Sequence, residues 1–265
     1  MTQPPGIDDQ QYPMHICKLQ RALYGLKQAP RVWFDRLDDF FISYGFFCSL
    51  VDPSLCVFHS AHRILALLLY VDDMLLTGSS TELVNSIIHI LSCEFSMKDL
   101  GPVHHFLGVE ISTTVDGLQL SQSHYAPTIL DRSSMLHCKP MSTSLETKFK
   151  IDADTSSAAA DPSQFRRIVG ALQYLTLTQP DLSYNVNYVS QFMHNPTVAH
   201  LKLVQRILRY LKGTIATGLH LSSNTTLDLH AFSDADWAGC PIIRRSTTGY
   251  YTFLGTNIIS WCAKK

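Results

Sequence analysis

Two adjacent carboxylates, Asp72 and Asp73, stand between two apolar runs at residues 64–70 and 74–77. Like charges this close repel each other, and apolar neighbours keep water away, so a divalent cation would stabilise the pair. Mg²⁺ prefers carboxylate oxygens, and two such ions about 3.5–4 Å apart can hold the attacking and leaving oxygens of a phosphoryl transfer. The alternative is an ordinary hairpin turn, in which aspartate is a preferred residue.

A row of basic side chains is the second feature that could do chemistry. Its members recur at intervals of four, three and three residues, so they share one face of a predicted helix, while leucine and valine residues line another face. Such a row suits contact with a nucleic-acid backbone, but a solvated helix face gives the same pattern. The row consists of Lys202, Arg206, Arg209 and Lys212.

Hydrophobic spacing predicts the elements that position these residues. The apolar runs around Asp72 and Asp73 are expected to form a buried hairpin, and a second hairpin is expected to turn at Asp116 and Gly117. Because helices and hairpins alternate irregularly, the pattern predicts a mixed α+β fold. The predicted helices cover residues 31–45, 81–91, 124–136, 163–177, 182–193 and 197–211, and the predicted strands cover 56–59, 64–70, 74–77, 105–111, 118–121, 227–232, 249–254 and 258–261.

The composition is that of a folded protein. Hydrophobic residues make up 46% of the 265 residues and charged residues 16%, which excludes a disordered chain. The formal net charge of −1 gives no bulk attraction to polyanions, so such binding needs a local arrangement. No apolar run approaches the roughly 20 residues that span a bilayer, and the seven cysteines are scattered without a C-x-x-C pair. We therefore expect a soluble, intracellular protein with reduced thiols, in the cytoplasm or the nucleus.

Short blocks along the whole chain resemble the Pol polyprotein of copia-type LTR retrotransposons, and they occur in the same order. The resemblance implies an RNA-directed DNA polymerase followed by the start of an RNase H domain. The blocks are LYGLKQAP at residues 23–30 followed by Trp33, YVDD at 70–73, FSMKDLG at 95–101, FLGVE at 106–110, IVGALQYL at 168–175, RILRYLKG at 206–213, SDADWAG at 233–239 and RSTTG at 245–249.

The resemblance implies roles for particular residues. Asp72 and Asp73 are expected to be catalytic and to hold Mg²⁺, of which the intact family uses two ions, and Asp234 is expected to be a metal ligand of the RNase H domain. Without the family, Asp234 reads only as the polar end of a strand. The segment beside template and nucleotide is expected to include Gly25, Lys27, Gln28 and Pro30, and the hairpin that holds the primer end is expected to include Phe106, Leu107 and Gly108.

These roles imply an RNA template, a DNA primer, deoxynucleoside triphosphates and the remainder of Pol as partners, and no membrane. A plain core hairpin is the alternative for residues 106–108, because apolar strand residues usually serve packing. A turn before a helix describes residues 25–30 equally well, and it does not conflict with the implied role.

The resemblance also divides the chain. Residues 1–140 are expected to form part of the reverse transcriptase palm and thumb, 141–162 a linker, 163–222 a helical connection, and 223–265 the N-terminal part of an RNase H-like sheet. In the family, a further catalytic aspartate precedes the segment that corresponds to residues 1–6, and later RNase H ligands follow residue 265. We therefore expect a fragment that is inactive alone; the alternatives are a non-catalytic nucleic-acid-binding remnant and a decayed, non-functional gene copy.

Overall fold

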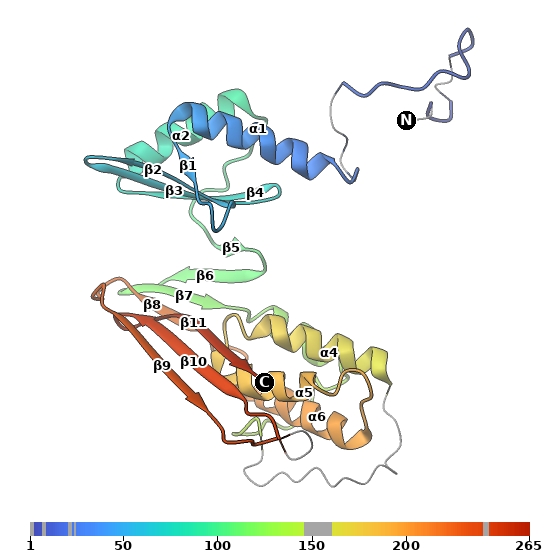
Figure 1. Ribbon diagram of the computed structural model, residues 1–265, viewed down its shortest axis with the longest axis vertical. Helices are drawn as coiled ribbons and strands as arrows, with labels where there is room; N and C mark the ends of the chain where they lie inside the picture. Colours follow the sequence, from blue (N-terminus) through green and yellow to red (C-terminus); the bar gives the residue numbers. More distant parts are fainter. Residues whose placement is uncertain (1–2, 7–8, 21–22, 24, 146–160, 241–243) are drawn as a thin grey trace. The chain divides into compact units, whose positions relative to one another are not determined.

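The computed structural model describes residues 3–6, 9–20, 23, 25–145, 161–240 and 244–265. The chain forms two compact units, Met1–Pro102 and Val103–Lys265, which are described separately below. Figure 1 shows helices and three antiparallel sheets along the chain. This arrangement confirms the mixed helix-and-sheet composition that the sequence predicts.

In the first unit, two helices pack on one face of a four-stranded sheet (Figure 1). Helix α1 begins beside Pro30 and ends at Gly45, whose φ of 96° lies in the left-handed region that glycine adopts without strain. Helix α2 begins after Ser80, whose side chain accepts a hydrogen bond from the backbone N–H of Leu83 at 3.2 Å. The elements are α1 (Ala29–Tyr44), β1 (Phe47–Cys48), β2 (Leu55–Ser60), β3 (Arg63–Tyr70), β4 (Asp73–Gly78) and α2 (Thr81–Glu94), and the strand order is β1-β2-β3-β4.

The core of this unit follows from alternation along β3. Leu65, Leu67 and Leu69 are buried and point to the same face, because successive strand side chains point to opposite faces. They meet the buried stripes of the two helices, which supply Leu37, Phe41, Ile87 and Leu91. Burying each such side chain contributes about 1.5–3 kcal/mol, so this packing is the main source of the unit's stability.

A disulfide joins Cys48 and Cys56 across β1 and β2, with the two Cα atoms 4.0 Å apart. The expectation of reduced thiols is wrong for this pair. The antiparallel register places the two cysteines directly opposite each other, and the scattered spacing in the sequence does not reveal this. Cys93, Cys138 and Cys262 are free thiols.

The second unit has a helical core and two sheets. The core residues come from its helices, including Leu130, Phe165, Leu172 and Ile207, all of which are buried. The helices are α3 (Tyr125–Arg132), α4 (Pro162–Leu175), α5 (Ser183–Ser190) and α6 (Val198–Gly213), with a 3-10 turn η1 (Pro180–Leu182) between α4 and α5. The first sheet has the order β5-β6-β7-β8, made of β5 (His105–Phe106), β6 (Val109–Thr113), β7 (Gly117–Ser121) and β8 (Leu219–Ser222).

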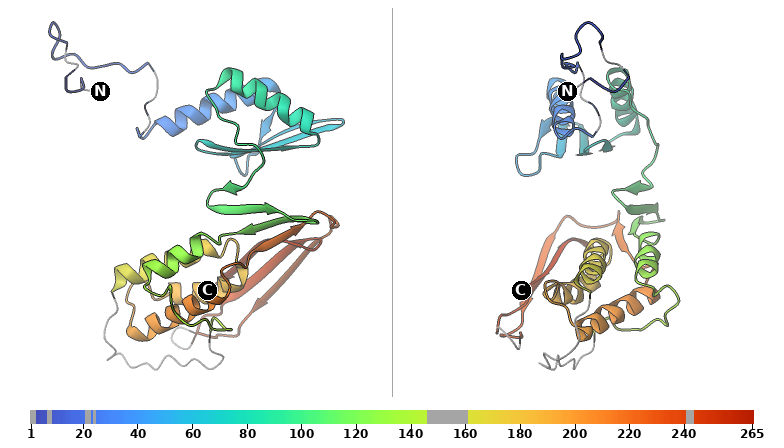
Figure 2. Two further views of the ribbon diagram at one scale, coloured as in Figure 1. Left: turned by 180° about the vertical axis from the view of Figure 1, so that it is seen from behind. Right: turned by 90° about the vertical axis from the view of Figure 1, so that its right-hand side faces the viewer.

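The second sheet of this unit has the order β11-β10-β9 and lies beside the helices (Figure 2). Strand β11 packs against α5, and the indole Nε1 of Trp261 donates to the backbone carbonyl of Thr176 at 3.0 Å. Strand β9 is exposed along its whole length. The strands are β9 (Leu229–Ala235), β10 (Thr248–Leu254) and β11 (Asn257–Lys264).

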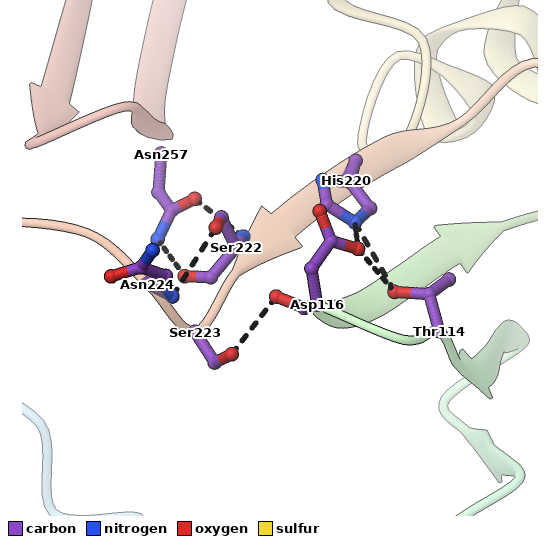
Figure 3. Close-up of polar contacts among 7 residues, drawn as sticks. All are labelled: Thr114, Asp116, His220, Ser222, Ser223, Asn224 and Asn257. Atoms are coloured by element: carbon purple, nitrogen blue, oxygen red, sulfur yellow. Dashed lines mark hydrogen bonds and ion pairs between the residues drawn. The ribbon is translucent and has the colours of Figure 1, made fainter.

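A polar cluster joins the two sheets of the second unit (Figure 3). The side-chain oxygen of Asn257 accepts from the backbone N–H of Ser222 at 2.7 Å, and its Nδ2 donates to the carbonyl of Ser222 at 2.9 Å. Nearby, His220 Nε2 lies 3.1 Å from Asp116 Oδ1, and the Thr114 hydroxyl donates to the same oxygen at 3.2 Å. The Thr114 hydrogen bond, together with the charge of His220, holds the pKa of Asp116 below its usual value.

Most predicted elements are present, and the differences are local. Strands β1 and β8 are not predicted by the sequence pattern, and the strand expected over 105–111 is interrupted by a turn at Leu107 and Gly108. Helix α3 ends at Arg132, four residues before the predicted end, and Ser134 has a φ of 55°, which a continuing helix does not allow. Residues 146–160 of the expected linker lie outside the described residues. In the part of the chain that is described, no helix has the length and hydropathy needed to span a membrane.

Candidate functional site

The hairpin of β3 and β4 carries the two adjacent carboxylates. Tyr70 and Asp73 face each other in the register, so Val71 and Asp72 form a two-residue turn. Asp72 and Asp73 are exposed, and neither carboxylate makes a hydrogen bond or ion pair to another described residue. Tyr70 and Val71 are 55% and 54% exposed, so the end of this hairpin is wetter than its sequence suggests. The carboxylate oxygens are therefore open to a ligand.

Helix α1 holds this turn through a single hydrogen bond. The indole Nε1 of Trp33 donates to the backbone carbonyl of Val71 at 2.9 Å. Val71 has a φ of 55°, which is unfavourable for a β-branched residue. In a two-residue hairpin turn, positive φ at the first turn position normally calls for glycine. The Trp33 hydrogen bond is thus made to Val71, the residue of the turn whose backbone conformation is unfavourable for its side chain.

Aromatic packing fixes the Trp33 ring. Its ring meets Phe95 edge-to-face with a centroid distance of 5.5 Å, and Phe40 meets the same Phe95 at 5.2 Å. The guanidinium of Arg36 lies 5.3 Å from the centroid of Phe95 and pairs with Glu94 at 3.2 Å. Such aromatic pairs contribute about 0.5–1.5 kcal/mol beyond area burial, so the indole has a defined place on α1.

The donor set at the hairpin end fits a hard cation. Two aspartate carboxylates supply oxygen ligands, which Mg²⁺ prefers, and they carry charge that no described neighbour neutralises. Among the described residues, the one group of three potential ligand side chains within 4.8 Å of each other is Asp38, Cys48 and Cys56. Since those two sulfurs are joined to each other, that group does not compete as a metal centre. Asp72 and Asp73 are therefore the two carboxylates of this hairpin that could hold a cation.

The segment expected beside template and nucleotide leads into α1. Gly25 has a φ of 87° and is exposed, as are Lys27, Gln28 and Pro30. Pro30 lies in the first helical turn, where its missing N–H costs nothing. The segment therefore presents one lysine and a glycine turn on the surface of the first unit, next to the helix that carries Trp33.

A second tight turn lies at the residues expected to hold a primer end. Phe106 pairs with Val109, so Leu107 and Gly108 form the turn between β5 and β6, with φ values of 48° and 74°. The hydroxyl of Tyr174 on α4 donates to the carbonyl of Leu107. A Cβ at position 108 would lie 2.5 Å from that hydroxyl oxygen, so this position requires glycine.

Glu110 anchors the start of α3 to the same hairpin. Its carboxylate accepts hydrogen bonds from the Ser123 hydroxyl at 2.5 Å and from the backbone N–H of His124 at 2.7 Å, and it lies 2.9 Å from the His124 ring nitrogen. Desolvation raises the pKa of Glu110, but the Ser123 and His124 hydrogen bonds and the His124 charge outweigh it and lower the pKa to about 2. Glu110 is thus an ionised structural residue at neutral pH.

The basic row on α6 is partly used within the protein. The guanidinium of Arg206 donates to the Thr143 hydroxyl at 2.8 Å, and Nε of Arg209 donates to the carbonyl of Lys139 at 2.9 Å. Lys202 is exposed and Lys212 is half-buried. The two arginines therefore fasten the segment after α3 onto α6, a role that their spacing alone does not indicate.

The acidic residues of β9 differ in their surroundings. Asp234 is exposed near the end of β9, and its Oδ1 accepts from the backbone N–H of Ala235 at 2.8 Å. Asp236 closes the following loop, because its Oδ1 accepts from the backbone N–H groups of Gly239 at 3.1 Å and Thr247 at 2.9 Å. Asp234 is thus the more available of the two carboxylates for a ligand.

The candidate residues are distributed over both units. The carboxylate pair and the segment at residues 25–30 belong to the first unit, whereas residues 106–108, the basic row and Asp234 belong to the second. The sequence indicates Trp33, Glu110 and Tyr174 only as members of the family motifs. The hydrogen-bond partners of Trp33, Glu110 and Tyr174 lie 38, 13 and 67 residues away in the sequence, respectively. An aromatic side chain with a donor, or a carboxylate, that lies close to a tight turn is the signal that would indicate such residues.

Comparisons with known proteins identify the family. A family model described as reverse transcriptase (RNA-dependent DNA polymerase) matches residues 1–147, more than half of the chain. The Pol polyprotein from transposon RE1 of Arabidopsis thaliana is 46% identical over all 265 residues, and that from transposon TNT 1-94 of Nicotiana tabacum is 38% identical over 277 aligned positions. An uncharacterized mitochondrial protein of Arabidopsis thaliana is 60% identical over 75% of this chain and 82% of its own length.

The chain spans 18% of the RE1 polyprotein and 21% of the TNT 1-94 polyprotein. No solved structure gives a significant match. The family model and the full-length alignment to transposon polyproteins agree with the order of the motifs along the chain. The chain therefore belongs to the reverse transcriptase family and corresponds to the reverse transcriptase region of copia-type retrotransposon Pol polyproteins.

Proposed function

We propose that this chain is the part of an RNA-directed DNA polymerase that contributes Asp72 and Asp73 as metal ligands of the polymerase site. The observation that carries the proposal is the pair of exposed, uncompensated carboxylates at the end of a hairpin whose turn is hydrogen-bonded to Trp33. The two exposed carboxylates offer adjacent oxygen ligands of the kind that Mg²⁺ prefers, and a bound cation would neutralise their charge.

The proposed ligand is Mg²⁺, as two ions in the complete site. Bound there, it would neutralise charge on the phosphoryl group that is transferred from a deoxynucleoside triphosphate to the primer. Asp72 and Asp73 would supply carboxylate oxygens as ligands from the end of the hairpin of β3 and β4. Because the carboxylates project from a hairpin, substrate oxygens can approach without displacing the core beneath.

The same proposal assigns contacts with nucleic acid. Lys27 is suited to a phosphate, and Gly25 permits close approach of the backbone to template and incoming nucleotide. Residues 106–108 would contact the primer end through a glycine-containing turn. On α6, Lys202 is the exposed member of the basic row and the best candidate for a backbone contact. The partners are then an RNA template and a DNA primer.

We further propose that residues 1–140 are palm and thumb, 163–222 a helical connection, and 223–265 the first strands of an RNase H-like sheet with Asp234 as a metal ligand. The exposure of β9 on both faces supports this, because such strands are normally covered by further chain. Since the polyprotein relatives are about five times longer, we expect the isolated chain to have little polymerase activity.

Manganese binding tests the proposal without requiring polymerase activity. Mn²⁺ replaces Mg²⁺ at oxygen sites and is observed directly by its electron paramagnetic resonance. Asp72→Asn and Asp73→Asn should each weaken Mn²⁺ binding by roughly ten-fold, because each removes one charged ligand. Asp39→Asn is the matched control, since Asp39 is an exposed aspartate on α1 in the same unit.

Equal Mn²⁺ affinity in the Asp72→Asn and Asp39→Asn variants would overturn the proposal. A second arm measures activity: the chain joined to the preceding polymerase segment of a plant relative should extend a primer on RNA with Mg²⁺. That extension should disappear in the Asp72→Asn variant and persist in the Asp39→Asn variant.

A further inference from the structure

We propose that Trp33 is a positioning residue for the carboxylate pair: its indole N–H holds the Val71 carbonyl and thereby orients Asp72 and Asp73 for metal binding. This inference rests on the proposed function. The motif that contains Trp33 does not indicate this role. Trp33 contacts the backbone of Val71, which lies 38 residues further along the chain.

The turn needs an external restraint. Val71 has a φ of 55° and a β-branched side chain, and 54% of that residue is exposed, so its own packing does little to hold this conformation. Without a restraint, the Val71 backbone would return to ordinary negative φ, and the following peptide would rotate. Asp72 is the next residue and Asp73 follows it, so both carboxylates would lose their direction.

Trp33 is built to supply that restraint. Its Nε1 lies 2.9 Å from the Val71 carbonyl oxygen, and its ring is fixed edge-to-face on Phe95, which is buried in the core. An indole has one donor and no acceptor, so it holds a carbonyl without offering a ligand to the metal. The carboxylates therefore stay available while the backbone beneath them is held.

Outer contacts of this kind affect metal affinity strongly. Groups that orient metal ligands typically change affinity by 10–100-fold when they are removed, although they do not touch the ion. Here the restraint acts on a peptide rather than on a ligand side chain, so we expect the lower end of that range. A merely structural role for Trp33 would instead change stability and leave the affinity of the folded protein unchanged.

Trp33→Phe is the test variant, because phenylalanine keeps an aromatic ring against Phe95 and removes the donor. The Mn²⁺ dissociation constant of the full chain should rise roughly ten-fold. Val71→Gly in the Trp33→Phe background should recover most of the lost affinity, since glycine adopts positive φ without a restraint. Trp261→Phe is the control, because Trp261 donates to Thr176 in the second unit and should leave the affinity unchanged.

Hydrogen exchange of the metal-free protein supplies an independent readout. The Trp33 indole proton should exchange slowly, and the Trp33→Phe variant should exchange faster at the Asp72 and Asp73 amides. Unchanged Mn²⁺ affinity in Trp33→Phe, or no recovery on adding Val71→Gly, would overturn the positioning role. If the wild type binds no Mn²⁺, the proposed function fails, whereas rapid exchange of the Trp33 indole proton would show that the restraint itself is absent.

Discussion

Two hairpin turns of this protein share an unfavourable backbone conformation at their first residue. One turn consists of Val71 and Asp72, and the other consists of Leu107 and Gly108. Each connects two antiparallel strands with two residues, and each has positive φ at its first residue. In each, the carbonyl of that first residue accepts a hydrogen bond from an aromatic side chain on a helix of the same unit, Trp33 in one and Tyr174 in the other.

The difference lies at the second turn position. Gly108 adopts φ of 74° and has no side chain, which lets the Tyr174 hydroxyl approach closely. In the other turn that position is Asp72, so the Trp33 hydrogen bond holds a backbone that carries an exposed carboxylate. At Gly108 the missing side chain allows close packing of the Tyr174 hydroxyl on the turn. At Asp72 the turn is also held by a hydrogen bond, but its second residue carries a carboxylate that faces solvent.

Adding a side chain at position 108 is the largest perturbation of this comparison. Gly108→Val should destabilise the second unit by about 3 kcal/mol, because it combines unfavourable positive φ with a clash against Tyr174. Chemical denaturation followed by fluorescence measures the loss. Gly170→Ala on α4 is the control, since no atom lies within 4 Å of its added Cβ and alanine favours a helix. If Gly108→Val lowers the free energy of unfolding by less than an ordinary surface substitution, the close packing of Tyr174 on position 108 would be contradicted.

Reducing the Cys48–Cys56 disulfide perturbs the unit that carries the other turn. The bond closes a loop with a sequence separation of eight residues, so its reduction should lower the free energy of unfolding by about 2 kcal/mol. Denaturation with and without a reductant, with thiol counting, measures this. The turn at Leu107 and Gly108 lies in the other unit, so its amide exchange rates serve as the internal control. An unfolding midpoint insensitive to reduction would show that the bond does not contribute.

Acid should affect the second unit through Glu110. Its pKa is about 2 in the folded protein against 4.5 as the ordinary value, so the carboxylate stabilises fully above pH 4.5 and this contribution is lost as the pH falls towards 2. Glu110→Gln should cost about 1–2 kcal/mol at pH 7, after allowance for partial solvation of the site. The difference from wild type should shrink between pH 4.5 and 2. A pH-independent difference would mean that the charge of Glu110 is not responsible.

Removing the Tyr174 hydroxyl is the mildest change. Tyr174→Phe should destabilise by about 1 kcal/mol, the usual contribution of one hydrogen bond, because the ring still packs edge-to-face against Tyr125. Exchange of the Gly108 amide should rise together with this loss. Equal stability and equal exchange in the variant would show that Leu107 does not depend on this bond, and the parallel with Trp33 would then fail.

Local signals predict much of the fold. Helix α1 follows from the apolar spacing between Pro30 and Gly45, and α2 follows from Ser80 as its cap, because capping and periodicity depend on neighbouring residues. The hairpin of β3 and β4 is predicted by two apolar runs around a polar turn. The metal-binding role of the carboxylate pair is implied by the family resemblance and stays a proposal, because the local pattern alone is also that of a simple turn.

Contacts between distant segments are not predicted. Strand β8 pairs with β7 about 100 residues earlier, and its four residues give no periodic signal of their own. The arginines at 206 and 209 match a phosphate-facing row by spacing, yet they bond the segment at residues 139–143. The turn at Leu107 is not predicted, because residues 105–111 have the pattern of one strand and leucine rarely adopts positive φ. In each of these cases a tertiary partner decides the outcome.

The proposed cation site consists of Asp72 and Asp73 on a turn that is hydrogen-bonded to Trp33. Paramagnetic broadening of backbone amide signals during a Mn²⁺ titration of the full chain tests it most directly, because broadening falls steeply with distance from the ion. The amides of residues 70–73 should broaden first, and Asp72→Asn should abolish this pattern. Broadening that begins elsewhere, or that persists unchanged in Asp72→Asn, would contradict it.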